Sequence, residues 1–245
     1  MALYDRDYVS SAASRAEEPV ASSEGYTQER VDPSDRSSIV AFLRKTYQIF
    51  AASLVAAATG AYVGLGFSET IATWYWGLVI LELGLLFGIY ALRSKPGLNL
   101  VVLFAFTLVS GLTLAPLLSH ILGLPGGGAI VAKTFATTSV IFGVLSFYSM
   151  TTTRDFTSMG KPLFIALIVI LVMAVVNIFL GSPLLQVGIA SFGALLFSAF
   201  IVYDTQNIIK GAFASPVEAA VALYIDFLNL FVSLLQLFGI FSSDE

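Results

Sequence analysis

The chain contains no cysteine and only one histidine, His120. Without cysteine, disulfide bonds and thiolate metal sites are excluded, and a single imidazole argues against a histidine-rich metal site or a Ser-His-Asp triad. Charged residues are also scarce, at 11%, whereas soluble domains carry about a quarter. With 57% hydrophobic residues and a mean hydropathy of +0.88, the sequence lacks the polar surface of a water-soluble domain and indicates an integral membrane protein.

The beginning of the chain differs in composition from the rest. Residues 1–37 mix both signs of charge and show almost no apolar periodicity, so we expect them to form a disordered, polar, cytoplasmic tail. No apolar core follows an early basic segment, which argues against a signal peptide. Residues 38–245 are expected to form one transmembrane domain, with a short amphipathic helix over residues 39–47 leading into it. The small net charge of −4 gives no sign of nucleic-acid binding.

Seven apolar runs follow the tail, and each is long enough to cross a bilayer at about 20 residues per helix. Glycine and proline mark all but one of the breaks between them. The sequence therefore predicts an all-α, polytopic membrane helix bundle with seven transmembrane helices, at residues 46–67, 71–93, 98–122, 129–151, 161–181, 184–209 and 217–241.

The basic residues predict an orientation in the membrane. A cytoplasmic amino terminus places Lys133 outside and all the other basic residues flanking the runs inside, as the positive-inside rule requires. Seven spans then put the carboxyl terminus on the far side. An even number of spans would put the carboxyl terminus on the cytoplasmic side and leave the amino terminus where it is. The residues on the cytoplasmic side are Arg36, Arg44, Lys45, Arg93, Lys95, Arg154, Lys161 and Lys210.

Two aspartates lie inside the last two apolar runs, Asp204 in 184–209 and Asp226 in 217–241. An ionisable side chain at the centre of a membrane helix costs about 2.5–3.5 kcal/mol. The predicted spans place Asp204 about 9 Å and Asp226 about 14 Å from the cytoplasmic end of each helix. Because a short loop makes the two helices antiparallel neighbours, the carboxyl groups can meet. Two such groups in a dry site cannot both ionise cheaply, so one holds a proton and the pair is a pH-sensitive latch.

Each aspartate has polar neighbours. Asn207 and Asn229 follow the aspartates by three residues and share their helix faces, and the phenols of Tyr203 and Tyr224 lie close enough to donate hydrogen bonds. The alternative interpretation is a buried polar cluster that only holds the last two helices together. Intramembrane carboxylates more often mark an ion pathway or a proton relay.

The second run carries two further charged residues, Glu82 and Arg93. Eleven residues are almost a whole number of turns, so both lie on one helix face, about 16 Å apart in depth. Arg93 is a candidate counter-charge for the aspartates, or it extends to the lipid headgroups as arginine often does. Glu82 is a candidate second station on a permeation path, or a protonated residue that serves packing.

Hydroxyl side chains line one stripe of the fourth run, and small-residue pairs occur in the first two. Such hydroxyls usually bond across helix interfaces, and Gly-x-x-x-Gly pairs permit close helix contact. We expect both sets to lie at contacts between helices. We expect His120 to lie at the membrane–water boundary and Asn177 to have no polar neighbour. The residues are Thr134, Thr138, Ser146 and Ser149, with Gly60 and Gly64 and with Gly84 and Gly88.

The residues around both aspartates resemble the Bax inhibitor-1 family in its bacterial branch. VYDTQ (202–206) and LYIDFLNLF (223–231) carry the resemblance, which extends over about residues 40–241, with support from GLTLAP (111–116) and FGVLSFY (142–148). It implies a seven-helix bundle with the last helix central, in the bacterial inner membrane. Some members are pH-sensitive calcium leak channels; by resemblance Asp204 and Asp226 are the paired pH sensor, Arg93 its switching partner and Glu82 the acidic pore residue.

A pH-sensitive calcium leak is therefore the leading functional hypothesis. Calcium prefers several oxygen ligands, and the spans offer few besides backbone carbonyls, so we expect weak binding at Asp204 and Asp226 and no bound cofactor. The available side chains are Glu82, Asp204, Asp226, Asn207 and Asn229.

Two other functions compete with the leak. Other bacterial members of the family are partners of a membrane-bound protease. The alternative function is therefore a regulatory partner of such a protease or of another membrane complex, without transport activity. Animal members are linked to suppression of cell death, a role that we do not expect for this protein. Tyr203-Asp204 resembles half of the presenilin-type protease signature, but Leu223-Tyr-Ile before Asp226 lacks its glycine. We therefore expect no enzymatic activity.

Overall fold

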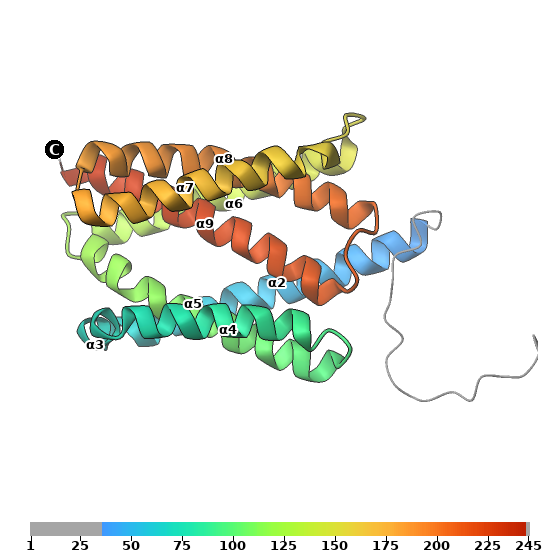
Figure 1. Ribbon diagram of the computed structural model, residues 1–245, viewed down its shortest axis with the longest axis horizontal. Coiled ribbons are helices and arrows are strands. Elements are labelled where there is room, and N and C mark those ends of the chain that lie inside the picture. The colour runs from blue at the N-terminus through green and yellow to red at the C-terminus, as the bar shows by residue number, and fades with distance from the viewer. Residues whose placement is uncertain (1–35, 244–245) are drawn as a thin grey trace, which may run out of the picture.

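The computed structural model describes residues 36–243, and that part of the chain is helical with no strand (Figure 1). The predicted disordered tail falls almost entirely outside the described residues and stays a prediction. The elements are α2 (Arg36–Leu65), α3 (Ser68–Thr73), α4 (Tyr75–Ala91), α5 (Pro96–Leu122), α6 (Gly127–Thr151), the 3₁₀ turn η1 (Thr157–Met159), α7 (Gly160–Leu180), α8 (Pro183–Ile209) and α9 (Pro216–Ser243).

Six of these helices, α2 and α5 to α9, are long and apolar enough to cross a membrane. The all-helical, multispan prediction is confirmed. The second predicted run, 71–93, is divided at Trp74 into the six-residue α3 and the 17-residue α4. A helix of 17 residues lies at the lower limit for a span, so the count of seven spans stays a prediction.

Most helix ends lie within two residues of their predicted positions because proline and glycine fix them. Pro183 occupies the first turn of α8, where its missing N–H costs nothing. Gly181 ends α7 with a left-handed φ of 57°, a conformation that glycine adopts without strain. The exceptions are the second run, where α3 begins at Ser68, and α2, which begins at Arg36. The predicted lead helix over 39–47 is continuous with the first span, since no glycine or proline separates them.

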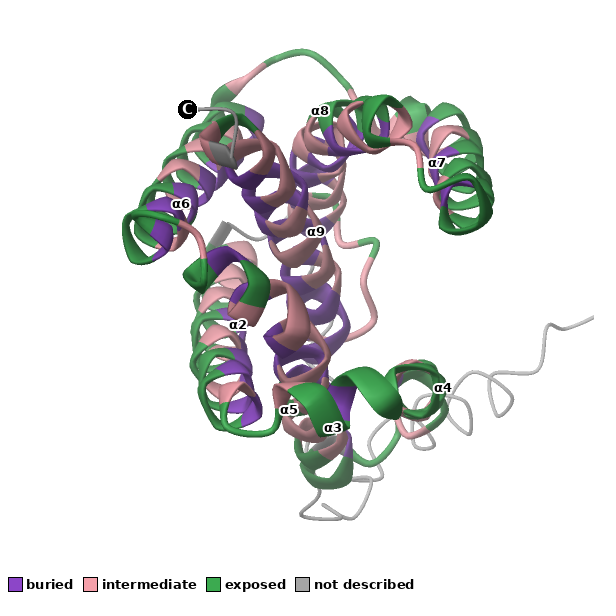
Figure 2. Cartoon of the chain, turned by 90° about the vertical axis from the view of Figure 1, so that its left-hand side faces the viewer, coloured by how far each residue is buried: buried purple, intermediate pink, exposed green. Residues whose placement is uncertain are grey.

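Helix α9 lies at the centre of the bundle and packs against α8, α2, α6 and α5 (Figure 2). Half of its most apolar window is buried inside the protein, compared with 11% for α7. Among the described elements, α7 packs on α8 and η1, and α4 packs mainly on α5. A helix that is buried on most sides must be apolar on most sides, so any ionisable residue on α9 needs a partner within the protein.

Helices α2 and α5 pack closely because glycine lies at their crossing. A Cβ added to Gly60 would collide with the backbone of Leu108, and one added to Gly111 would lie 2.8 Å from the carbonyl carbon of Ala57. Gly64 likewise packs on Ala115 of α5. The predicted close contact at Gly60 and Gly64 therefore occurs within one chain. A Cβ at Gly84 would meet no atom within 4 Å.

Replacing Gly111 by alanine is expected to destabilise the protein, because the added Cβ forces α5 away from the α2 backbone. Overpacking of this kind costs about 1–3 kcal/mol. The measurement is thermal unfolding in detergent, followed by circular dichroism. Gly143→Ala is the matched control, since a Cβ there meets nothing within 4 Å and alanine is the better helix former. Equal melting temperatures for the two variants would contradict the role of Gly111.

Candidate functional site

The structure brings the carboxyl groups of Asp204 and Asp226 together between α8 and α9. The two side chains hydrogen-bond to each other, and Asn207 is a second partner of Asp204. Asp226 is 3% exposed, and its Oδ2 atom has no hydrogen-bond partner within the described residues. Ionised carboxylates only accept hydrogen bonds. A hydrogen bond between two carboxyl groups therefore forms only while the pair holds at least one proton.

The two tyrosines that neighbour the aspartates in sequence point elsewhere. The Tyr224 side chain is fully buried, and its hydroxyl hydrogen-bonds with Ser110 Oγ of α5. The Tyr203 hydroxyl lies over Gly160, on the side of α8 that faces α7. Tyr224 thus joins α9 to α5 and Tyr203 joins α8 to α7, and no hydrogen bond to either aspartate is found for them in the described structure.

Arg93 lies apart from the aspartates. It is exposed in the turn that follows α4, and among the described residues it forms no ion pair with Asp204 or Asp226. Within residues 36–243, no ion pair between either aspartate and an arginine is found.

Glu82 of α4 lies in a polar cavity of about 350 Å³ shared with α5 and α9. Its Oε2 atom accepts a hydrogen bond of 3.2 Å from Thr113 Oγ1. Asn229 lines the same cavity from α9, while its Nδ2 atom donates to the carbonyl of Ile225 at 2.8 Å. Ser110 also lines it, so the cavity reaches the hydroxyl that bonds Tyr224, two residues before Asp226.

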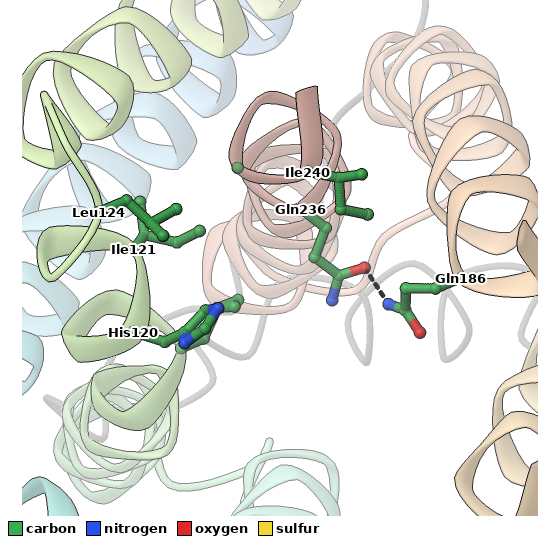
Figure 3. Close-up of a pocket in the computed structure, with 8 residues that line it drawn as sticks. His120, Ile121, Leu124, Gln186, Gln236 and Ile240 are labelled. Carbon is green, nitrogen blue, oxygen red and sulfur yellow. Dashed lines mark hydrogen bonds between the residues drawn. The ribbon is translucent and has the colours of Figure 1, made fainter. Parts of the chain in front are cut away.

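A second cavity, of about 230 Å³, adjoins the first at the end of the bundle where α5 terminates (Figure 3). Gln236 and Leu117 line both cavities. In the second one, Gln186 Nε2 donates to Gln236 Oε1 at 2.7 Å, and Asn177 Nδ2 donates to Gln186 Oε1 at 2.9 Å. His120, which is exposed, lies at this cavity too. Polar side chains therefore extend from His120 along α9 towards the aspartates.

Gln236, Gln186 and Ser110 were not among the predicted site residues. The signal for Gln236 was present, because Asn229 and Gln236 follow Asp226 by three and ten residues and project from the same side of an α-helix. Asn177 is not isolated, as was expected, since it bonds Gln186. No comparable signal marks Gln186 and Ser110, which depend on how α8 and α5 pack against α9.

A third buried carboxyl group was also missed. Glu218, in the first turn of α9, is 7% exposed, and its Oε2 atom accepts a hydrogen bond of 3.3 Å from Ala214 N. Ser215 Oγ accepts from Glu218 N at 3.2 Å. Ser215-x-x-Glu218 is the sequence signature of a helix amino terminus with reciprocal capping. Glu218 therefore stabilises the beginning of α9 and adds a carboxyl group near the aspartate pair's end of the bundle.

The hydroxyl stripe of α6 has two roles. Ser149 Oγ donates to the carbonyl of Val202 in α8 at 2.8 Å, so it bonds across an interface as predicted. Thr134 and Thr138 donate to carbonyls of α6 itself, both at 2.8 Å. Ser146 gathers with Tyr47 of α2 and Thr205 of α8 in a cluster of hydroxyl groups.

Gln206 of α8 holds the loop between α6 and α7. Its Oε1 atom accepts from Phe156 N at 2.7 Å, and its Nε2 atom donates to the carbonyl of Arg154 at 2.8 Å. Lys210 adds an exposed ion pair with Asp155 at 2.7 Å and a hydrogen bond to Thr157. The loop that follows α6 is thus held by Gln206, which lies two residues after Asp204 in α8.

The described residues contain no group of three or more His, Cys, Asp or Glu that is arranged to hold a metal ion. Two carboxyl groups and an amide are available at Asp204, Asp226 and Asn207. Calcium takes six to eight oxygen ligands, so such a set fits weak, water-assisted binding of a passing ion.

The hydrogen bond from Lys210 and those from Thr157 hold the pKa of the Asp155 carboxyl well below its usual range. Because the pKa of Asp155 is lowered in the folded protein, the stability that its carboxylate adds to the docked loop is fully present above the usual aspartate pKa of about 4. That stability is lost only as the pH falls below this value. Docking of the α6–α7 loop should therefore not change between pH 5 and pH 8. Cleavage by trypsin at Arg154, measured across that range after correction for the enzyme's own pH profile, tests this expectation.

At constant pH, Gln206→Leu is expected to open the loop, because it leaves Phe156 N and the Arg154 carbonyl without partners. Losing two hydrogen bonds of about 1 kcal/mol each should speed trypsin cleavage at Arg154 by roughly tenfold. Asp155→Asn is the control. Exposed ion pairs contribute about 0–1 kcal/mol, so its effect should be several times smaller. Faster cleavage in Asp155→Asn than in Gln206→Leu would contradict the assignment of Gln206 as the main anchor.

The amino-acid sequence of this chain is similar to a known family and to several known proteins. A family profile described as "Inhibitor of apoptosis-promoting Bax1" matches residues 39–243. An uncharacterised protein of Helicobacter pylori is 49% identical over 85% of this chain and 90% of its own length. An uncharacterised membrane protein of Vibrio cholerae is 33% identical over 83% and 91%. The Golgi anti-apoptotic protein of vaccinia virus is 35% identical over 81% and 84%.

Proposed function

This chain belongs to the Bax inhibitor-1 family, and we propose that it is a pH-sensitive calcium leak channel gated by Asp204 and Asp226. The observation that carries the proposal is the hydrogen-bonded carboxyl pair between α8 and α9, deep in an apolar bundle. A polar cavity with Glu82 and Asn229 lies beside it. Carboxyl groups at such depth usually mark a pathway for ions or protons.

The proposed membrane arrangement has seven spans, with α3 and α4 together forming the second. The amino terminus is cytoplasmic and the carboxyl terminus lies on the far side of the bacterial inner membrane. The aspartate pair is then near the cytoplasmic side, and the cavity with His120 and Gln236 opens to the other. An ion entering there passes Gln236, Asn229 and Glu82 before it reaches the aspartates.

Proton binding to the aspartate pair sets the gate in this proposal. With a shared proton the pair needs no counter-charge, and Arg93 remains outside, as in the structure. When the proton leaves, two neighbouring negative charges in a dry site require a cation. Arg93 then moves inward, brings α4 onto α8 and α9, and closes the path. The leak therefore increases as the pH falls.

Calcium is the proposed permeant ion because the path offers oxygen ligands, which hard cations prefer. Glu82, the aspartates and the side-chain amides supply too few for tight binding. Conduction requires sites that an ion enters favourably and leaves readily. A sparse set of oxygens is thus suited to a leak and unsuited to storage.

Calcium flux into proteoliposomes is expected to increase from pH 8 to pH 6 for the wild-type protein. In the Asp204→Asn/Asp226→Asn variant no charge develops that attracts Arg93, so flux should stay high and independent of pH. At pH 8 we expect it to exceed the wild-type flux by about tenfold, which corresponds to about 1.4 kcal/mol in the gating equilibrium. Arg93→Gln should also raise flux at pH 8.

Asp155→Asn is the control for this experiment, since it removes an exposed carboxylate and leaves the pair intact. It should keep the wild-type pH profile. An unchanged, steep pH profile in the double aspartate variant would refute gating by the pair. Absence of flux in every protein would instead favour the alternative function, a regulatory partner of a membrane-bound protease.

Glu82→Gln is expected to reduce calcium flux by about tenfold without moving the pH at which flux is half-maximal, because Glu82 lines the path and is separate from the gate. Initial rates at several calcium concentrations provide the measurement. Glu69→Gln, which removes an exposed carboxylate of α3, is the matched control and should conduct normally. A shift in the pH midpoint with undiminished maximal flux would assign Glu82 to the gate instead.

A further inference from the structure

An apolar groove of about 410 Å³ lies between α2 and α6, with α5 and α9 as its floor. The buried part of its lining includes Ala57 and Ala61 of α2 and Phe227 and Phe231 of α9. Its rim is exposed at Val55, Tyr62 and Phe135. The groove is separate from both polar cavities described above.

Helices α2 and α6 each pack on α9, and they contact each other where Phe50 stacks on Phe142; the groove lies beyond that contact, over residues 54–65 of α2. In Figure 2 both helices lie on the same side of α9. Both are also long and apolar enough to cross a membrane. The opening between them therefore faces the hydrocarbon of the bilayer, and its apolar lining is continuous with the lipid-facing surface.

The length of the groove corresponds to one leaflet. On α2 it extends from Leu54 to Leu65, which is about 17 Å at 1.5 Å per residue. Half of the hydrocarbon core is about 15 Å thick. An extended acyl chain of a lipid in that leaflet therefore has the right length to lie along the groove.

The volume fits a hydrocarbon chain and cannot enclose a whole transmembrane helix. A helix is at least about 10 Å across with its side chains and needs about 1,300 Å³ over this length. A single hydrocarbon chain, about 5 Å across at normal carbon contact distances, needs about 300 Å³. The groove, at about 410 Å³, matches the chain and is far too small for a helix of a second copy.

The floor of the groove is also the wall of the polar cavity. Leu114 and Leu228 line both the groove and the cavity that holds Glu82. The Tyr224 ring lines the groove, while its hydroxyl bonds Ser110 on the cavity side. We propose that the groove is a binding site for one acyl chain of a bilayer phospholipid, which fills the space behind Tyr224, Leu114 and Leu228.

Native mass spectrometry of the protein purified from membranes in a mild detergent tests this site. The wild-type protein is expected to retain one phospholipid per chain. Ala58→Phe, which fills the groove from α2, should reduce the lipid-bound fraction at least fivefold. Val172→Phe places the same aromatic side chain on α7, at a position that is 57% exposed, and should retain lipid as the wild type does.

A melting temperature for each variant shows whether it is folded. If Ala58→Phe is destabilised, Val55→Trp fills the same groove from the rim, where residue 55 is 67% exposed, and should give the same loss of lipid. Equal phospholipid retention in all folded variants, or detergent as the only adduct, would overturn the proposal. Because the chain has no native cysteine, oxidation of Ala58→Cys tests the other occupant. Disulfide-linked dimers would mean that a second copy covers the groove.

Discussion

The bond between the carboxyl groups of Asp204 and Asp226 is the constraint that the rest of the bundle satisfies. A carboxylate without a partner in an apolar interior costs several kcal/mol. The interactions of Asp204 with Asp226 and with Asn207 offset part of this cost. The bond requires α8 and α9 to be neighbours at one fixed register, and it requires other helices to shield α9 from lipid. The central position of α9, in contact with α8, α2, α6 and α5, follows from that requirement.

Helix α9 borders two different environments, the polar cavities on one side and the apolar groove on another. Asp226, Asn229 and Gln236 project to one side and line or adjoin the polar cavities. Phe227 and Phe231 project to another side and form the floor of the apolar groove. Because its polar and aromatic side chains lie on different faces, this one helix borders both the polar cavities and the apolar groove. The two environments meet only at a thin layer of side chains.

Much of the architecture was predictable because local chemistry sets it. Apolar runs with proline and glycine between them gave helix ends within two residues at most positions, and composition indicated the membrane. The predicted start of the first span was wrong because the amphipathic segment 39–47 continues into the apolar run as one helix, α2. The aspartate contact was accessible from sequence because antiparallel neighbours joined by a short loop bring residues of equal depth together, whatever the remaining helices do.

The sequence alone determined the class of the protein, most of its helices and the position of each charge along its helix, since these depend on composition and on a fixed rise per residue. Only the tertiary structure decided which side chains converge. Helix rotation and crossing turned Tyr224 towards Ser110 and Gln236 towards Gln186, and left Arg93 exposed. These choices arise from packing between distant segments. The Gly60-x-x-x-Gly64 spacing indicated that α2 packs closely on another helix, but only the structure shows that this helix is α5, where Gly111 meets Ala57.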